Sequence, residues 1–176
     1  KGKVQMSKLS VNMKEVGRAF SALKKTIMAM NIGSFLGFFV GILPAAGATP
    51  ASLMSYGITK QLSRNSKEFG SGVPAGVVAP ECANNSASTG SMLPMLTLGI
   101  PGSPTTAILL GGMILWGLTP GPLLFTQQPE FVWGLIGSLY IANFFTLVLN
   151  IALIPAFLMV LRIPFAILAP VIFVLC

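Results

Sequence analysis

Three short segments of the chain combine proline and glycine with hydroxyl or amide side chains, and each lies inside a long apolar stretch. They are Gly41–Pro50, Pro80–Ser86 and Leu98–Thr106. We expect each segment to end one helix and begin another, because Pro and Gly interrupt helical hydrogen bonding. A helix that begins inside a membrane presents free N–H groups that suit a carboxylate, whereas the carbonyl groups of a helix that ends there suit Na⁺.

The candidate ligands are the polar side chains and the small residues of these segments. Asn84 and Asn85 offer amide groups that could bind an ion or a carboxylate, or could instead join neighbouring helices. Glu81 is the acidic residue of the interrupted region and a candidate cation ligand or proton carrier, although a position after Pro80 near the membrane interface would also suit it. The other candidates for substrate or ion binding stand at the expected helix ends: Gly47, Thr49, Ser52, Gly99, Pro101, Gly102, Ser103, Thr105 and Thr106.

Covalent catalysis is disfavoured by the residue types that are missing. The sequence contains no His and no Asp, so a serine or cysteine nucleophile would have no His base and a transition metal no His ligand. Cys82 and Cys176 are far apart and lie among apolar or small residues, which gives no support to a disulfide framework or a thiolate metal site. We expect a protein that is not an enzyme and has no cofactor, with Na⁺ or H⁺ as the coupling ion.

The composition indicates a membrane protein. Apolar residues make up 53% of the chain and charged residues only 9%, whereas soluble domains carry about 25% charged residues. Several uncharged stretches exceed the roughly 20 residues that a helix needs to cross a bilayer. The net charge of +7 comes from Lys and Arg gathered in short segments that flank apolar ones, which indicates a cytoplasmic side rather than a nucleic-acid surface.

These patterns predict an all-α polytopic membrane protein with broken helices. Residues 32–59 carry Pro44 near their middle and have basic residues on both sides, which favours a re-entrant hairpin with its tip at 43–50 over a single broken span. The chain lacks an initiator Met and stops inside an apolar run, so we expect a fragment of a longer protein. The full set of expected segments is an interfacial amphipathic helix or linker over 1–31, the interrupted helix or hairpin over 32–59, a polar loop over 60–72, a broken-helix substrate and ion region over 73–125, a long transmembrane helix over 131–161, and the start of a further membrane segment over 163–176.

The same interruptions resemble those of the large membrane subunit of the tripartite tricarboxylate transporter family. The matching residues extend from about Gly33 to Phe125 and look like the opening part of the second half of an inverted-repeat protein. Ala45 departs from the family pattern, which usually has Gly after the Leu-Pro pair. The motifs that carry the resemblance are Gly41-Ile42-Leu43-Pro44, Gly47-Ala48-Thr49, Ala79-Pro80-Glu81, Ala83-Asn84-Asn85, Pro94-Met95-Leu96-Thr97-Leu98-Gly99-Ile100-Pro101-Gly102 and Pro120-Gly121-Pro122-Leu123-Leu124-Phe125.

The resemblance implies a multi-pass subunit of a secondary importer in the bacterial cytoplasmic (inner) membrane. Its implied partners are a small membrane subunit, a periplasmic substrate-binding protein, a tricarboxylate or related carboxylate, and the lipid bilayer, with no nucleic acid. A cation gradient rather than ATP would drive transport, which agrees with the absence of a phosphate-binding loop. The alternative is a non-transporting assembly or scaffold subunit whose breaks only allow close helix packing. The sequence does not choose the carboxylate, the coupling ion or the oligomeric state.

Overall fold

The computed structural model describes residues 24–160 and 169–173, and the regular structure of these residues is helical. The chain divides into two units, Phe20–Trp133 and Lys1–Ala19 with Gly134–Cys176, which are described separately. Residues 1–23 of the expected amphipathic helix lie outside the described residues. The helices of the described part are α2 (Ile27–Ile42), α3 (Ala48–Leu62), the 3-10 turn η1 (Ser66–Glu68), α4 (Ala75–Gly90), α5 (Met92–Leu98), α6 (Pro104–Leu115), α7 (Leu124–Gln127) and α8 (Pro129–Val160).

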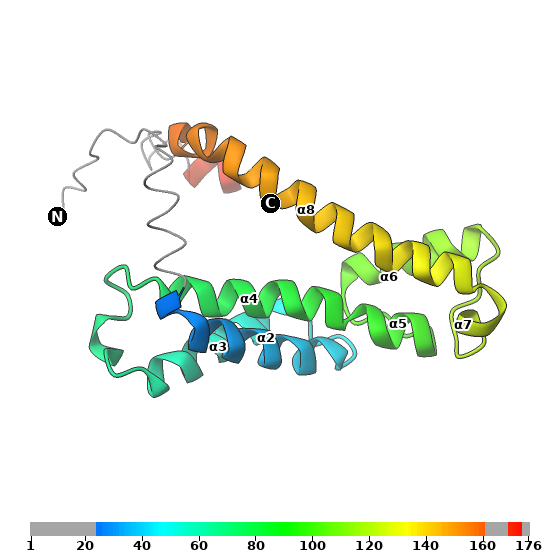
Figure 1. Cartoon of the computed structure of the whole chain (residues 1–176), viewed down its shortest axis with the longest axis horizontal. Helices are drawn as coiled ribbons and strands as arrows, with labels where there is room; N and C mark the ends of the chain where they lie inside the picture. Colours follow the sequence, from blue (N-terminus) through cyan, green and yellow to red (C-terminus); the bar gives the residue numbers. More distant parts are fainter. Residues whose placement is uncertain (1–23, 161–168, 174–176) are drawn as a thin grey trace. The chain divides into compact units, whose positions relative to one another are not determined.

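Helices α2 and α3 form an antiparallel hairpin (Figure 1). The connecting turn runs from Leu43 to Gly47, so the chain reverses at the Pro44 segment where the sequence predicts an interruption. The two helices contain 16 and 15 residues, or about 24 and 22 Å at 1.5 Å per residue. Each is therefore shorter than the roughly 30 Å hydrocarbon core of a bilayer.

Helices α2 and α4 run parallel and touch through their backbones. Gly33, Gly37 and Gly41 face Ala79, Ala83 and Ala87 in the same order, and a Cβ atom added to any of the three glycines would collide with the carbonyl oxygen of its facing alanine. Small residues four positions apart lie on one face of a helix, and they allow two membrane helices to approach closely. Glycine on α2 is thus required by the approach of α4.

Helix α3 covers another side of α4 with a stripe of small residues of its own. Ala51, Ser55 and Thr59 are spaced by four positions and are almost completely buried. The Ser52 hydroxyl donates to the carbonyl oxygen of Pro80 at 3.0 Å and so links the two helices. The core of the hairpin and α4 is built from Ala51, Ala83 and Ala87 together with Val40. A core of such small side chains depends on close backbone approach rather than on bulky apolar groups.

The prediction that the segment Pro80–Ser86 ends a helix is wrong. Helix α4 continues through Pro80, Asn84 and Asn85 as far as Gly90, and the break lies at Ser91 between α4 and α5. A proline inside a helix removes one N–H donor. That local loss is outweighed here because the neighbouring turns of α4 pack against both α2 and α3.

Beyond the break, short helices α5, α6 and α7 are joined by tight turns. Helix α5 ends at Gly99, whose φ of 69° is left-handed, and α6 ends before Gly117, whose φ is 74°. Glycine adopts this conformation without the strain that a Cβ atom causes. The connection between α6 and α7 packs on α5, since the Gly121 N–H donates to the Leu96 carbonyl oxygen at 3.0 Å.

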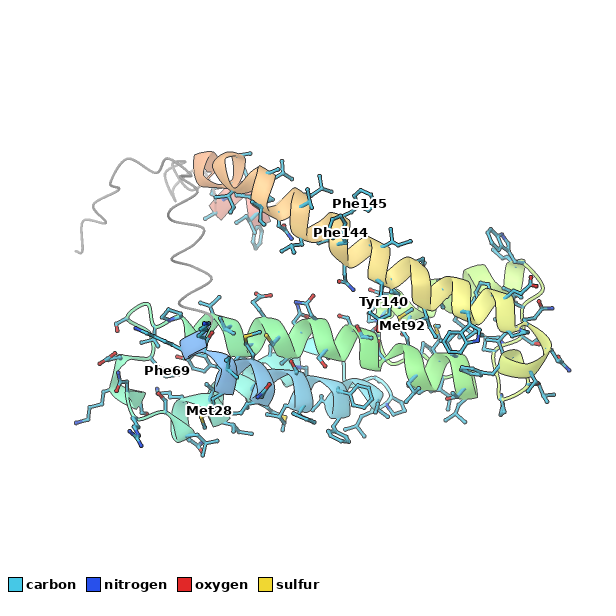
Figure 2. All side chains as sticks on the ribbon, in the orientation of Figure 1. Met28, Phe69, Met92, Tyr140, Phe144 and Phe145 are labelled. Carbon is cyan, nitrogen blue, oxygen red and sulfur yellow. The ribbon has the colours of Figure 1, made fainter. Side chains whose placement is uncertain are left out.

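Helix α8 is the one helix of the described residues that is long and apolar enough to cross a membrane. The qualifying part, Pro129–Ile154, has 26 residues and a mean hydropathy of 1.8. From Tyr140 to Ile154 its apolar side chains are exposed, as the labelled Phe144 and Phe145 illustrate (Figure 2). Two shorter apolar helices, α2 and α6, fall below the spanning length. Of the segment expected over 163–176, the described residues 169–173 are helical.

Candidate functional site

The tip of the hairpin contains two residues with a positive φ, Ala45 and Gly47. Ala45 has a φ of 61°, a left-handed conformation in which the Cβ atom is unfavourable, and Gly47 has a φ of 71° with a ψ of 179°, which only glycine adopts readily. Gly47 is also the N-cap residue of α3 and offers no side chain to its first turn. The first N–H groups of α3 therefore have no side-chain cap. Thr49 is exposed in this turn.

The start of α6 is capped by its own side chains. The Ser103 hydroxyl accepts from the Thr106 N–H at 3.2 Å, and the Thr106 hydroxyl oxygen accepts from the Ser103 N–H at 2.9 Å. Pro104 follows at the first helical position, where its missing N–H costs nothing. This capping box places the helix start where the sequence predicts it. It also occupies the hydroxyl groups of both candidates, whereas Thr105 is exposed beside them.

The first and third interruptions meet at the end of α4. Gly102 is buried, and a Cβ atom placed on it would lie 2.9 Å from the Ser91 Cβ and 3.1 Å from the Gly41 carbonyl oxygen. The Ser91 and Ser103 hydroxyl oxygens are 3.4 Å apart. The last turn of α2, the connection between α4 and α5, and the segment before α6 are therefore in contact. We call Gly41, Ser91, Gly102 and Ser103 the junction.

Sequence reasoning did not select Ser91 as a site residue. Its side chain is 1% exposed and its hydroxyl donates to the Ser88 carbonyl oxygen at 2.8 Å. The available signal was the pair Gly90-Ser91, two small residues between two helical stretches. That pair was obscured because the break was assigned to the segment around Pro80.

The candidates Glu81, Asn84 and Asn85 lie on one exposed face of α4, together with Ser88. We call these four residues the polar face. Their spacing of three and four positions places them opposite the buried alanines of the same helix. Asn85 and Ser88 bond back to carbonyl oxygens of α4, but within the described part of the chain the Glu81 carboxylate and the Asn84 amide have no partner.

The polar face has the chemistry of a cation or carboxylate site. Its carboxylate and amide oxygens are hard ligands suited to Na⁺, while the amide N–H groups can donate to a carboxylate. Asn84 precedes Ser91 by two helical turns, or about 10 Å along the axis. Among the described residues, the Ser91 hydroxyl of the junction donates to the Ser88 carbonyl oxygen of the polar face at 2.8 Å, but no hydrogen bond joins the junction to the side chain of Glu81, Asn84 or Asn85. Gly102 thus lies against the end of α2, Ser103 meets Ser91, and Thr106 bonds to Ser103, whereas Glu81, Asn84 and Asn85 lie on a separate face of α4.

The remaining candidates lie around these two groups. Gly47 and Gly99 are helix-end residues with positive φ, Pro101 is half-buried in the α5–α6 connection, and Ser52 is engaged with α4. Among the described residues, no group of three or more His, Cys, Asp or Glu side chains could hold a metal ion. The binding roles of all the candidate residues stay predictions.

Comparison with known proteins gives matches in sequence. A protein of Agrobacterium vitis described as an uncharacterized protein in the TAR-II ttuC' 3' region is 46% identical over 136 residues, which are 77% of this chain and 56% of that protein. An uncharacterized 52.8 kDa protein in the TAR-I ttuC' 3' region of the same organism is 44% identical over 142 residues, or 81% of this chain and 28% of that protein. The chain spans about half of the first relative and just over a quarter of the second. No solved structure matches it.

The family model described as the tripartite tricarboxylate transporter TctA family matches residues 1–176. The resemblance that the motifs indicate is thereby confirmed. The chain belongs to the tripartite tricarboxylate transporter TctA family, a family of transporters rather than enzymes.

Proposed function

We propose that the chain forms part of the membrane subunit of a secondary importer for tricarboxylates or related carboxylates. In this proposal the subunit is a multi-pass protein of the bacterial inner membrane, is driven by a Na⁺ or H⁺ gradient, and works with a small membrane subunit and a periplasmic binding protein. Family membership supports the class of function. The observation that carries the proposed site is the polar face of α4, where the Glu81 carboxylate and the Asn84 amide have no partner among the described residues.

A membrane setting agrees with the surface of the helical unit. Apolar side chains such as Phe35 and Phe39 on α2 are 68% and 64% exposed, and Ile108 on α6 is 79% exposed. Apolar side chains exposed along several helices suit lipid or further membrane helices. The polar face of α4 does not suit lipid, because a carboxylate and amides in hydrocarbon need partners. It would instead line the substrate and ion path, with the cation at Glu81 or Asn84.

The hairpin geometry supports a re-entrant segment. Helices α2 and α3 are each too short to cross, and the start of α2 lies at the same end of the hairpin as the end of α3 (Figure 1). Lys25 precedes α2 and Lys60 lies in the last turn of α3, so both basic residues belong to that end. The tip at residues 43–47 would then lie at membrane depth, where the uncapped start of α3 can receive a substrate carboxylate. Single cysteines at Met28 and Leu62, in a background without Cys82 and Cys176, test this topology. Labelling from opposite sides of the membrane would contradict it.

Uptake of carboxylate by the complete three-component system in proteoliposomes tests the proposed function. Transport should require both the full-length subunit and the cation gradient. The alternative is a scaffold subunit. In that case uptake should persist when this subunit is omitted, as long as another permease subunit is present.

Site variants of the full-length protein separate binding from folding. Asn84→Ala and Thr105→Ala remove exposed polar groups that bond to nothing else in the described structure, so folding should be preserved while uptake falls at least tenfold. Gln61→Ala is the matched control, because Gln61 also has an exposed amide side chain that forms no hydrogen bond in the described structure. If both site variants transport as well as the control and keep the same cation dependence, the assignment of these residues is wrong.

A further inference from the structure

Five cationic side chains gather at one end of the unit Phe20–Trp133, and the proposed function gives none of them a binding partner. Two precede α2, one lies in the last turn of α3, and two belong to the loop between α3 and α4. The hairpin brings the start of α2 and the end of α3 to the same end (Figure 1). All five are exposed, and we call this group the basic collar: Lys24, Lys25, Lys60, Arg64 and Lys67.

The positive charge of the collar is almost uncompensated. Glu68 is the one acidic residue in this region of the described chain, and its carboxylate accepts from the Asn65 amide at 3.3 Å. None of the five cations forms an ion pair with a described residue. Like charges held together without counter-charges repel one another and favour an anionic partner.

The loop that carries Arg64 and Lys67 has a defined conformation. Phe69 is 8% exposed, and its ring meets that of Tyr56 edge to face, with centroids 5.6 Å apart. The ring of Phe69 also borders Gly76 at the start of α4. The Ser71 hydroxyl donates to the Glu68 carbonyl oxygen at 2.6 Å. The loop is therefore anchored between α3 and α4, which keeps the segment with Arg64 and Lys67 at the same end of the unit as Lys60.

Exposed apolar side chains adjoin the cations. Ile27 and Met28 follow Lys25 and are 52% and 56% exposed, and Leu62 follows Lys60 by two positions and is 56% exposed. Met28 and Phe69 lie at this end of the unit (Figure 2). A phosphate with acyl chains beside it fits this combination, because cations meet the headgroup while apolar side chains enter the hydrocarbon boundary. A nucleic acid has no apolar chains that would contact Ile27, Met28 and Leu62.

We propose that the basic collar binds the phosphate groups of acidic phospholipids at the membrane surface. This inference rests on the proposed function insofar as it places the unit in a membrane. Each Lys or Arg near an anionic leaflet contributes about 1 kcal/mol, or about a fivefold preference. The three cations of α3 and the loop should together give about a hundredfold preference for acidic over zwitterionic lipid.

The experiment measures the relative affinity of the purified full-length protein for phosphatidylglycerol and phosphatidylcholine, by native mass spectrometry in mixed micelles. Lys60→Gln/Arg64→Gln/Lys67→Gln should lower the preference about a hundredfold, and Lys24→Gln/Lys25→Gln about 25-fold. The matched control Lys60→Arg/Arg64→Lys/Lys67→Arg keeps every charge and should keep the preference. The wild-type preference should also weaken with added salt, because surface charges are screened.

An unchanged preference in both neutralised variants overturns the proposal, as does an equal loss in the charge-preserving control. Inorganic phosphate at millimolar concentration separates the two sources of the same chemistry. Failure of free phosphate to displace the lipid supports a lipid surface, and full displacement overturns it in favour of a soluble phosphate site. Lipid binding needs no substrate, so uptake measured separately distinguishes failure of this inference from failure of the transport function.

Discussion

Replacing Gly37 with alanine should destabilise the protein, although alanine is the better helix former. The added Cβ atom would lie 2.7 Å from the Ala83 Cα and 2.9 Å from its carbonyl carbon, and it would collide with the carbonyl oxygen. Carbon atoms in contact prefer about 3.5–4.0 Å, so α2 and α4 must separate by about 1 Å at this point. Because helices are stiff, the neighbouring contacts at Gly33 and Gly41 would loosen as well.

The magnitude follows from two opposing terms. Overpacking typically costs about 1–3 kcal/mol, whereas exchanging Gly for Ala in a helix gains about 1 kcal/mol. We therefore expect a net loss of about 1 kcal/mol for Gly37→Ala. Gly57→Ala is the matched control, because Gly57 also lies within a helix but has no atom within 4 Å of an added Cβ. That variant should gain about 1 kcal/mol.

The assay is thermal unfolding of the full-length protein in one detergent. The quantity measured at each temperature is the fraction of protein that stays monodisperse. The apparent midpoints should move in opposite directions, down for Gly37→Ala and up for Gly57→Ala. If the apparent midpoint of Gly37→Ala is equal to or higher than that of Gly57→Ala, the backbone contact between α2 and α4 does not exist as described.

Three further predictions concern single residues. Ala45→Gly should stabilise the protein by about 1 kcal/mol because it relieves a left-handed alanine, whereas Gly47→Ala should destabilise it by about 1–3 kcal/mol; both are measured by thermal unfolding. Ser103→Ala should cost about 1 kcal/mol by removing the N-cap of α6, and Ser103→Asn should restore most of it; equal stability of the two variants would count against the cap. Thr59→Val should stabilise by about 1 kcal/mol, because the buried Thr59 hydroxyl has no hydrogen-bond partner; a lower unfolding midpoint would contradict this.

Much of the fold could be predicted from local sequence signals. Pro44 lies between two apolar runs that are each too short to cross, which is sufficient to predict a reversal there. The helix start at Ser103 follows from a hydroxyl residue before Pro104 with a second hydroxyl three positions after it, the pattern of a capping box. The start expected for the long helix, residue 131, differs by two residues from the observed start at Pro129, because an uninterrupted apolar run has few alternatives.

The position of the break in α4 could not be predicted in the same way. Local propensity counts Pro80 and the two asparagines against a helix, but it contains no term for the partner helices. The alanines of α4 match the glycines of α2 at a constant offset, and this match has meaning only when the two helices are known to run parallel. Alanine at every fourth position is common in membrane segments. The signal was present but was ambiguous without the pairing.

The candidate site was only partly accessible for a related reason. Residue type identified Asn84 and Glu81 as unusual inside an apolar region, and the structure leaves both side chains unpartnered within its described part. Residue type also made Ser103 and Thr106 candidate ligands, whereas in the structure their hydroxyl groups bond within the cap of α6. The resemblance gives a signal for Ala45. A family that usually has Gly at this position indicates a left-handed backbone there, and Ala45 adopts one with a φ of 61°.

The contact between α2 and α4 also affects the proposed ion site, because α4 carries small residues on one side and the polar face on the other. With no flexible side chain between the two backbones, the position of Glu81 and Asn84 relative to the hairpin is set by the backbone contact itself. Widening this contact by about 1 Å is comparable to the tolerance of a metal or substrate site, where distances must hold within about 0.5 Å. Gly37→Ala should therefore raise the cation concentration needed for half-maximal uptake, although it touches no proposed ligand. Gly57→Ala should leave that concentration unchanged, and an equal response of the two variants would show that the polar face does not depend on the α2–α4 spacing.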